Sequence, residues 1–478
     1  MKVKSRKAVI PRSSPSRRPA IRHHQSFQRD LTTPSLTLLT IGGIMGSGLF
    51  MASGLAIRHA GPSVIWLYLL GALAMYLEIN ALAEMSIASP SPGSFLVITR
   101  QVLGPGWTFV AGWIFWFSSV LTMSSEVTAA AIFSRYWFPG IPLWIWSLIY
   151  SIAIVAVNFI SVRGFGLIED IIAGIKTVAV LLFVIIGVLS VLHIIGVRYS
   201  GASHPFSSML SHGGWLPHGI FGAAPAFLLV LFAYAGTGVI GLAAAEAKTP
   251  QTTIPKAIHI SVVLVIAMYL GSILTILSLS SWTHLSDKVS PFVVALHAVQ
   301  LPYVSFLMNL VLLFAVLSTM NAALYSNVRV LYSLARQGDA PKWLGHLNAK
   351  GIPAHATWTS ASLLALTIVL AYVLPHKAYA YLVTATGFQA MFIWFVILRT
   401  QLRFRHHLEQ SSPQKLQFRL KGYPWTTWLV IGLVLIALAA SPLAKGELLG
   451  AVVGLGGIII AVGIWFVLRK RISVRHQP

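Results

Sequence analysis

Two charged side chains lie inside long apolar stretches of this chain. Glu126 belongs to the stretch FSSVLTMSSEVTAAA, and Lys176 belongs to IEDIIAGIKTVAVLLF. A charge surrounded by hydrocarbon is costly, so residues of this kind by default indicate a functional site. A carboxylate and an amine attract ligand groups of opposite charge. We therefore treat Glu126 and Lys176 as candidate site residues.

Three more acids lie in or near apolar stretches: Glu78, Glu84 and Glu169. Glu84 and Glu169 are close to the ends of their stretches, where local pairing or contact with water is the simpler interpretation. Lys176 lies about seven residues beyond the polar pair Glu169-Asp170. That distance weakens the simpler interpretation for the lysine.

Glycine clusters interrupt two other apolar stretches. Residues 42–48 read GGIMGSG and residues 235–238 read AGTG. Glycine costs a helix roughly 1 kcal/mol relative to alanine, so both clusters favour local unwinding. Unwound backbone within a membrane is tolerated where it lines a cavity, and there it offers free N–H and C=O groups. Helix ends of both polarities suit a zwitterion such as an amino acid.

Close helix packing is the alternative interpretation of the glycines, because small residues let helices approach one another. The positions of the clusters argue for a site. One lies in the first and the other in the sixth of the membrane spans that we predict, five helices apart. Interrupted helices at matching positions of two halves are typical of transporters built from inverted repeats. We infer the repeat from these positions, since no residue-level repeat is visible.

The elements that carry these residues are predicted to be transmembrane helices. The 478 residues are 56% hydrophobic and only 9% charged, whereas a soluble domain has about 25% charged residues. A helix needs roughly 20 apolar residues to cross a bilayer. We predict twelve spans, near residues 35–57, 63–85, 106–134, 143–162, 167–195, 219–245, 257–280, 302–334, 355–374, 379–402, 424–442 and 447–468. The short apolar stretch 291–300 is predicted to be a lid or an interfacial helix.

The basic residues determine the predicted orientation. With the N-terminus inside, 27 of the 34 lysine and arginine residues fall in cytoplasmic segments and 6 outside. Cytoplasmic loops carry such an excess, so both termini are predicted to be cytoplasmic. The net charge of +23 then faces the anionic inner leaflet of the lipid bilayer, and no nucleic-acid partner is needed. Residues 1–34 are predicted to be a disordered basic tail, and 469–478 a second cytoplasmic tail.

Several kinds of chemistry have no signature here. The absence of cysteine rules out zinc–thiolate sites and disulfides. No G-x-x-x-x-G-K-[ST], H-E-x-x-H or G-x-S-x-G motif occurs, so we expect no cofactor, no metal, no catalytic residues and no enzyme activity. A channel would show a pore-lining repeat or filter loop, and neither is visible. A secondary transporter is the remaining prediction.

Several long motifs, in order, are similar to the amino acid–polyamine–organocation superfamily. These are TIGGIMGSGLFMASG, Trp113 and Trp116 with Glu126-Val-Thr-Ala-Ala, PGIPLW with residues 158–166, FAYAGTGVIGLAAAEAKTPQTTIPKAI, and LSTMNAALYSNVRVLYSLARQGDAPKWL. The resemblance runs from about Leu36 to Trp465. Within the superfamily, the chain resembles the bacterial amino acid permeases of the GABA, proline and aromatic amino acid type.

The resemblance implies an all-α fold of twelve transmembrane helices. Residues 35–195 would form the first five-helix repeat, 219–402 the inverted second repeat, and 424–468 two further helices. It implies that the substrate carboxylate meets N–H groups of Gly46, Ser47 and Gly48, and that the amino group meets carbonyls of Ile44, Phe232 and Ala235. Tyr234 and Gly236 complete the predicted substrate site, and Phe232, Tyr234 and Trp116 are candidates to line a pocket for an apolar or aromatic side chain.

Two further implications concern coupling. Lys176 matches a lysine that takes the place of a sodium ion in proton-coupled members, and Glu126 is the acid expected on the transport path. One position departs from the family, since Gly238 stands where members commonly have an acid; this argues against a cationic substrate. We therefore expect a plasma-membrane importer of an amino acid, driven by protons. An exchanger or a membrane sensor stays the alternative, and oligomeric state and substrate identity stay open.

Overall fold

The computed structural model describes residues 32–90, 95–160, 165–194, 207–210, 212–243, 247, 249–299, 302–348, 352–443 and 448–474. The elements of these residues are all helices, which confirms the predicted all-α class. The predicted basic tail lies outside the described residues up to position 31, and the C-terminal tail does so from position 475.

The first half of the chain contains helical structure in each predicted span. Its elements are α1 (Thr33–Ile44), η1 (Gly48–Ala52), α2 (Ser53–Ala60), η2 (Gly61–Ser63), α3 (Val64–Ala88), α4 (Phe95–Val102), α5 (Pro105–Ser134), α6 (Leu143–Ile160), α7 (Phe165–Val191) and α8 (Ser207–Leu210).

The second half of the chain is also a succession of helices. Its elements are α9 (Gly219–Ala233), α10 (Gly238–Ala243), α11 (Pro250–Leu279), η4 (Trp282–His284), α12 (Pro291–Ala298), α13 (Pro302–Gln337), η5 (Lys342–Gly345), α14 (Ala354–Val373), α15 (Ala378–Ser411), η6 (Pro413–Lys415), α16 (Trp425–Ala440), η7 (Ser441–Leu443) and α17 (Leu448–Val474).

Within the described ranges, nine helical segments are long and apolar enough to cross a membrane, and α1, α6 and α9 are shorter apolar helices. Each of the twelve predicted spans contains a helix, while the count of twelve crossings stays a prediction. The short stretch at 291–300 does form a helix, α12, whose Phe292 packs on Phe50 of η1. Helix α4 was not expected, because eight residues give too short a periodic pattern.

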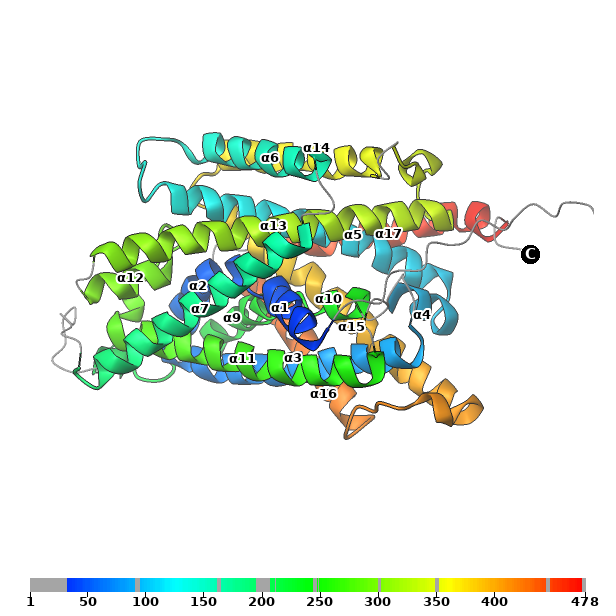
Figure 1. The fold of residues 1–478 in the computed structure, drawn as a ribbon, viewed down its shortest axis with the longest axis horizontal. Coiled ribbons are helices and arrows are strands. Elements are labelled where there is room, and N and C mark those ends of the chain that lie inside the picture. Colours follow the sequence, from blue (N-terminus) through cyan, green and yellow to red (C-terminus); the bar gives the residue numbers. More distant parts are fainter. Residues whose placement is uncertain are drawn as a thin grey trace, which may run out of the picture.

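The interrupted helix α1 lies near the middle of the bundle (Figure 1), where it packs against α7, α10, α11 and α13. Helices α6 and α14 lie side by side at one edge of the view. Their outward residues are large and apolar: Ile152 is 60% exposed and Leu366 is 65% exposed. An apolar outer surface over buried polar groups is the reverse of a soluble protein, and it suits a hydrocarbon solvent.

Candidate functional site between two interrupted helices

The first interruption lies at the glycine cluster of residues 42–48. Helix α1 ends at Ile44, and helical structure resumes at η1 with Gly48. At positions 46 and 48 no side chain larger than that of glycine fits without a shift of its neighbours. A Cβ on Gly46 would lie 2.5 Å from Oε1 of Glu126, and one on Gly48 would lie 2.7 Å from Cα of Ala233. The glycines therefore let an acid and a second backbone come close to the break.

The second interruption faces the first. Helix α9 ends at Ala233 and α10 begins at Gly238. Gly236 between them has φ of +113°, a backbone conformation that glycine adopts without steric cost. A Cβ there would collide with the carbonyl oxygen of Gly43. The two unwound segments thus touch each other backbone to backbone.

Glu126 of α5 closes over the first interruption. The Ser47 backbone N–H lies 3.1 Å from each carboxylate oxygen of Glu126, and the Ser47 hydroxyl donates to Oε1 over 3.0 Å. The acid is only 2% exposed. A carboxylate near the first turn of a helix is stabilised by the exposed N–H groups there. Glu126 therefore accepts a hydrogen bond from the Ser47 N–H, which we predicted to bind the carboxylate of the substrate.

Lys176 of α7 reaches the same interruption from the other side. Its Nζ donates to the carbonyl oxygen of Gly42 over 2.8 Å and to that of Met45 over 3.3 Å. The lysine is completely buried, and its charge interacts with the carboxylate of Glu126. The two charges predicted as site residues thus lie on either side of one break, holding its N–H and C=O groups.

Three hydroxyl groups that we did not predict also hold the interruptions. Tyr269 of α11 places its hydroxyl 3.1 Å from the Ile44 carbonyl oxygen and 3.0 Å from that of Ala233. Tyr379 donates to the Ser47 carbonyl over 2.9 Å, and Thr319 donates to that of Met45 over 3.1 Å. The sequence shows only that Tyr269 lies in the middle of a predicted span, and this does not indicate which groups its hydroxyl contacts.

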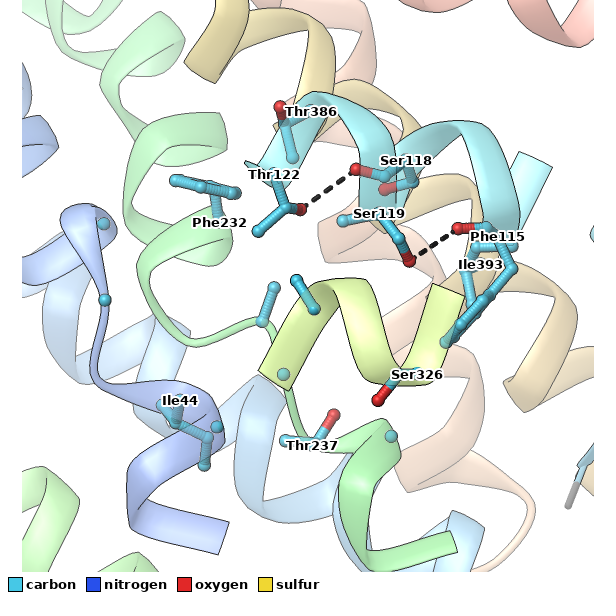
Figure 2. Close-up of a pocket in the computed structure, with 18 of the residues that line it drawn as sticks. Ile44, Phe115, Ser118, Ser119, Thr122, Phe232, Thr237, Ser326, Thr386 and Ile393 are labelled. Carbon is cyan, nitrogen blue, oxygen red and sulfur yellow. Dashed lines mark hydrogen bonds between the residues drawn. The ribbon is translucent and has the colours of Figure 1, made fainter. Parts of the chain in front are cut away.

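A cavity lies between the interruptions, α5, α13 and α15 (Figure 2). Apart from Glu126 and Trp394, the polar side chains that line it carry hydroxyl groups, and Ser119 and Thr122 donate theirs to carbonyls of α5 itself. Of the predicted site residues, seven line it: Ile44, Gly46, Gly48, Glu126, Phe232, Ala235 and Gly236. The other lining residues include Phe115, Ser118, Ser119, Thr122, Thr237, Thr319, Ser326, Thr386 and Trp394.

The remaining candidates lie elsewhere. Tyr234 stacks on Tyr269 and donates its hydroxyl to the Tyr68 carbonyl over 3.2 Å, behind the cavity wall. Trp116 donates its indole N–H to the Ser360 hydroxyl over 3.1 Å and does not line this cavity. Ser47 and Lys176 do not line the cavity themselves. They contact residues of the first interruption and Glu126.

Glu84 is paired, although not locally as expected. Its carboxylate accepts from Gln401 over 2.9 Å, from the Leu420 backbone N–H over 2.6 Å and from Arg405 Nη1 over 3.1 Å. These partners follow it by more than 300 positions, so no sequence spacing could have indicated them. The side chain of Glu169 lies outside the described part of the chain.

Apolar helices around a central cavity define a multi-pass membrane protein with a site for a small solute. The chain belongs to the amino acid permease family: the family described as "Amino acid permease" matches residues 35–464.

Curated relatives agree with this membership. The chain is 34% identical to the uncharacterised amino acid permease YtnA of Bacillus subtilis, over 87% of this chain and 90% of the relative. It is 33% identical to the gamma-aminobutyric acid permease of Bacillus subtilis, over 93% and 94% respectively. It is 30% identical to the L-asparagine permease of Escherichia coli, over 95% and 91%. The protein therefore transports amino acids across a membrane and is not an enzyme.

Proposed function

We propose that this protein imports an amino acid across the plasma membrane by proton symport, through alternating access. The observation that carries the proposal is the meeting of both interrupted helices at one cavity. The start of η1 offers N–H groups at this cavity, and the ends of α1 and α9 offer carbonyl groups. A zwitterion needs both kinds of group.

In this proposal the substrate carboxylate binds at Gly46, Ser47 and Gly48. The Ser47 N–H is engaged by Glu126, and the Gly46 N–H donates to the Ile44 carbonyl over 3.1 Å. Substrate binding therefore requires the Glu126 carboxylate to shift away from Ser47. The amino group binds at the carbonyls of Ile44, Phe232 and Ala235. A carbonyl oxygen that accepts one hydrogen bond retains a second lone pair, whereas the Ile44 carbonyl accepts from both the Gly46 N–H and the Tyr269 hydroxyl and has to give up one of them when the substrate binds.

The side chain of the substrate is proposed to be uncharged. Among the residues that line the described cavity, Glu126 carries the one formal charge, and it is already bound to Ser47. The other lining side chains carry hydroxyl groups or are aromatic or aliphatic. A charged side chain in this cavity would lack a partner and pay its full desolvation cost.

Proton coupling is assigned to Lys176 and Glu126. The lysine holds two carbonyls of the first interruption, so loss of its proton would weaken its hold on both of them, because hydrogen bonds from a charged donor are the stronger ones. A change in the charge of Lys176 also changes its attraction for Glu126, and Glu126 blocks the Ser47 donor. Protonation would in this way be tied to the state of the substrate site.

The topology that we propose is the predicted one. Twelve spans cross the bilayer with both termini in the cytoplasm, residues 35–195 and 219–402 form two inverted repeats, and 424–468 add two helices. The 27-to-6 distribution of basic residues supports this orientation, because such residues concentrate in cytoplasmic loops.

A two-part experiment tests the proposal. The purified protein in detergent is first screened for thermal stabilisation by the twenty protein amino acids, gamma-aminobutyric acid and polyamines, since a ligand of the folded state stabilises it by RT ln(1 + [L]/Kd). The best radiolabelled ligand is then offered to proteoliposomes with and without an inward proton gradient. We expect concentrative uptake only with the gradient.

The Lys176→Ala variant completes the test. It should bind the ligand in the thermal screen and lose gradient-driven uptake, while Lys256→Ala, on the exposed face of α11, should retain both. Gradient-driven uptake by Lys176→Ala at the wild-type rate would refute the coupling role. Exchange of internal for external ligand by the wild-type protein, with no response to the gradient, would identify an exchanger instead.

A further inference from the structure

Glu78 is a buried acid without a hydrogen-bond partner. It lies in the middle of α3 and has no exposed surface. Neither of its carboxyl oxygens makes a hydrogen bond to any described group. This separates it from the other two buried acids of the spans, because Glu126 binds Ser47 and Glu84 binds Gln401 and Arg405.

The surroundings of Glu78 supply no compensating charge. Helix α3 packs against α2, η2, α4, α9, α10, α11, α15 and α16, and no described cation contacts the Glu78 carboxyl. Arg100 of α4 binds Gln337 and Asp339. The basic residues of α2 precede the first residue of α3, about four helical turns before Glu78. The buried titratable groups on or directly after these helices have other partners: Tyr234, which follows α9, Tyr269 in α11, and Tyr379 and Arg405 in α15. Helices α10 and α16 carry no titratable residue.

Thr237 is the polar side chain that lies beside the Glu78 carboxyl, although the two groups do not meet in hydrogen-bond geometry. It belongs to the unwound segment between α9 and α10, is 1% exposed, and has no hydrogen-bond partner among the described groups. Thr237 also lines the central cavity. The acid is therefore linked to the second interruption through one hydroxyl, while Lys176 and Glu126 serve the first interruption.

We propose that Glu78 is a second proton-carrying site, which couples protonation to the second interruption; the inference rests on the proton symport proposed above. An unpaired carboxylate in this place would be an uncompensated buried charge, which is far costlier than the neutral acid. In this arrangement the neutral, protonated form of Glu78 is therefore favoured. The proton leaves to water when movement of the α9–α10 segment opens the acid to the cavity, and Thr237, a donor and an acceptor, lies on that route.

The experiment compares proton-to-substrate ratios in proteoliposomes. The probe is the radiolabelled amino acid that gives the largest thermal shift among the twenty protein amino acids and gamma-aminobutyric acid. With the membrane potential held at zero, each coupled proton sustains about a tenfold accumulation for a tenfold proton concentration difference, because equal ratios correspond to equal free energies. The variants are Glu78→Gln, which imitates the protonated acid, and Asp287→Asn, which neutralises an acid in the loop after η4.

We expect Glu78→Gln to bind and exchange the probe like the wild-type protein, and to couple one proton fewer per substrate. Asp287→Asn should keep the wild-type ratio. A wild-type ratio in Glu78→Gln would overturn the inference and leave the symport proposal standing. A wild-type protein that exchanges the probe but never accumulates it with a proton gradient would overturn both.

A second variant covers the case in which Glu78→Gln does not fold. Glu78→Asp keeps an acid but withdraws it by one methylene from Thr237. It should retain coupled uptake with a displaced pH profile, because the carboxyl then meets the second interruption differently. A pH profile identical to that of the wild-type protein would overturn the inference.

Discussion

The carboxylate of Glu126 accepts hydrogen bonds from both the backbone N–H and the hydroxyl of Ser47, a residue 79 positions earlier in the chain. An acidic side chain thereby sits where the proposed function requires the carboxylate of the substrate. The same acid lies within reach of the charge of Lys176. In the proposed function, this contact couples binding of the substrate to the charge state of the site.

The first prediction concerns competition for Ser47. A hydrogen bond to a charged group contributes about 1.5–3 kcal/mol, and Glu126→Gln replaces the charged acceptor by a weaker one. The substrate should then displace it more easily, and its Kd should fall by about tenfold, which corresponds to about 1.4 kcal/mol. Equilibrium binding of the radiolabelled substrate measures the change. Ser47→Ala keeps the backbone N–H and should alter Kd less, and a weaker affinity in Glu126→Gln would show that the acid helps to bind the substrate.

A second prediction tests the contact between the two interruptions. Gly48→Ala would place a Cβ 2.7 Å from the Ala233 backbone, and overpacking of this kind costs about 1–3 kcal/mol. We expect a lower apparent melting temperature and loss of substrate uptake. The matched control is Gly174→Ala in α7, where nothing lies within 4 Å of the added methyl group, and which should be neutral or slightly stabilising. Equal behaviour of the two variants in a melting curve would contradict the close approach.

A third prediction concerns Tyr269. Tyr269→Phe removes the hydroxyl that serves Ile44 and Ala233 and leaves buried carbonyls with one partner fewer, at a cost of about 1–3 kcal/mol. Uptake should fall by at least tenfold with little change in the amount of folded protein. Tyr303→Phe is the control, since Tyr303 is 83% exposed. The measurement is the initial rate of uptake in proteoliposomes, normalised to the amount of reconstituted protein. An unchanged rate in Tyr269→Phe would show that the Tyr269 hydroxyl is not needed for transport.

A fourth prediction addresses stability at the end of α15. Arg405→Ala leaves the Glu84 carboxylate buried without its cation, and breaking a buried pair costs about 3–5 kcal/mol. The apparent melting temperature in detergent should drop markedly. Arg403→Ala, two residues away on the exposed face, should leave it unchanged. A similar small effect of both substitutions would mean that Glu84 is held by Gln401 and the Leu420 N–H alone.

The sequence predicted where the two helices are interrupted, but it predicted few of the side-chain contacts made at the interruptions. Glycines at 42–48 and 235–238 predicted both breaks, because glycine destabilises a helix wherever it stands. Lys176 and Glu126 were predicted as site residues, because an apolar stretch makes a charge conspicuous. Tyr269 was missed, and Tyr234 was predicted to line a pocket that it does not reach, because an aromatic residue gives the same signal in a core as in a site.

Long-range partners explain the rest of what was missed. Glu84 and Arg405 meet across 321 positions, and nothing in either local sequence names the other. Glu78 looked like any acid in an apolar stretch, and only the packing of α3 against the second interruption reveals that it lacks a partner. Such relationships depend on how helices are arranged, and one sequence does not encode them in a readable pattern.

The close approach of Gly48 to Ala233, and of Gly236 to Gly43, has a mechanical consequence. With no side chain between the backbones, neither interrupted helix can rotate against the other without a collision. The two interrupted helices should therefore move together as one rigid body, and this body should rotate relative to the other helices of the bundle. Because the chain contains no cysteine, pairs of introduced cysteines could report distances within the body and across its boundary without any background substitution.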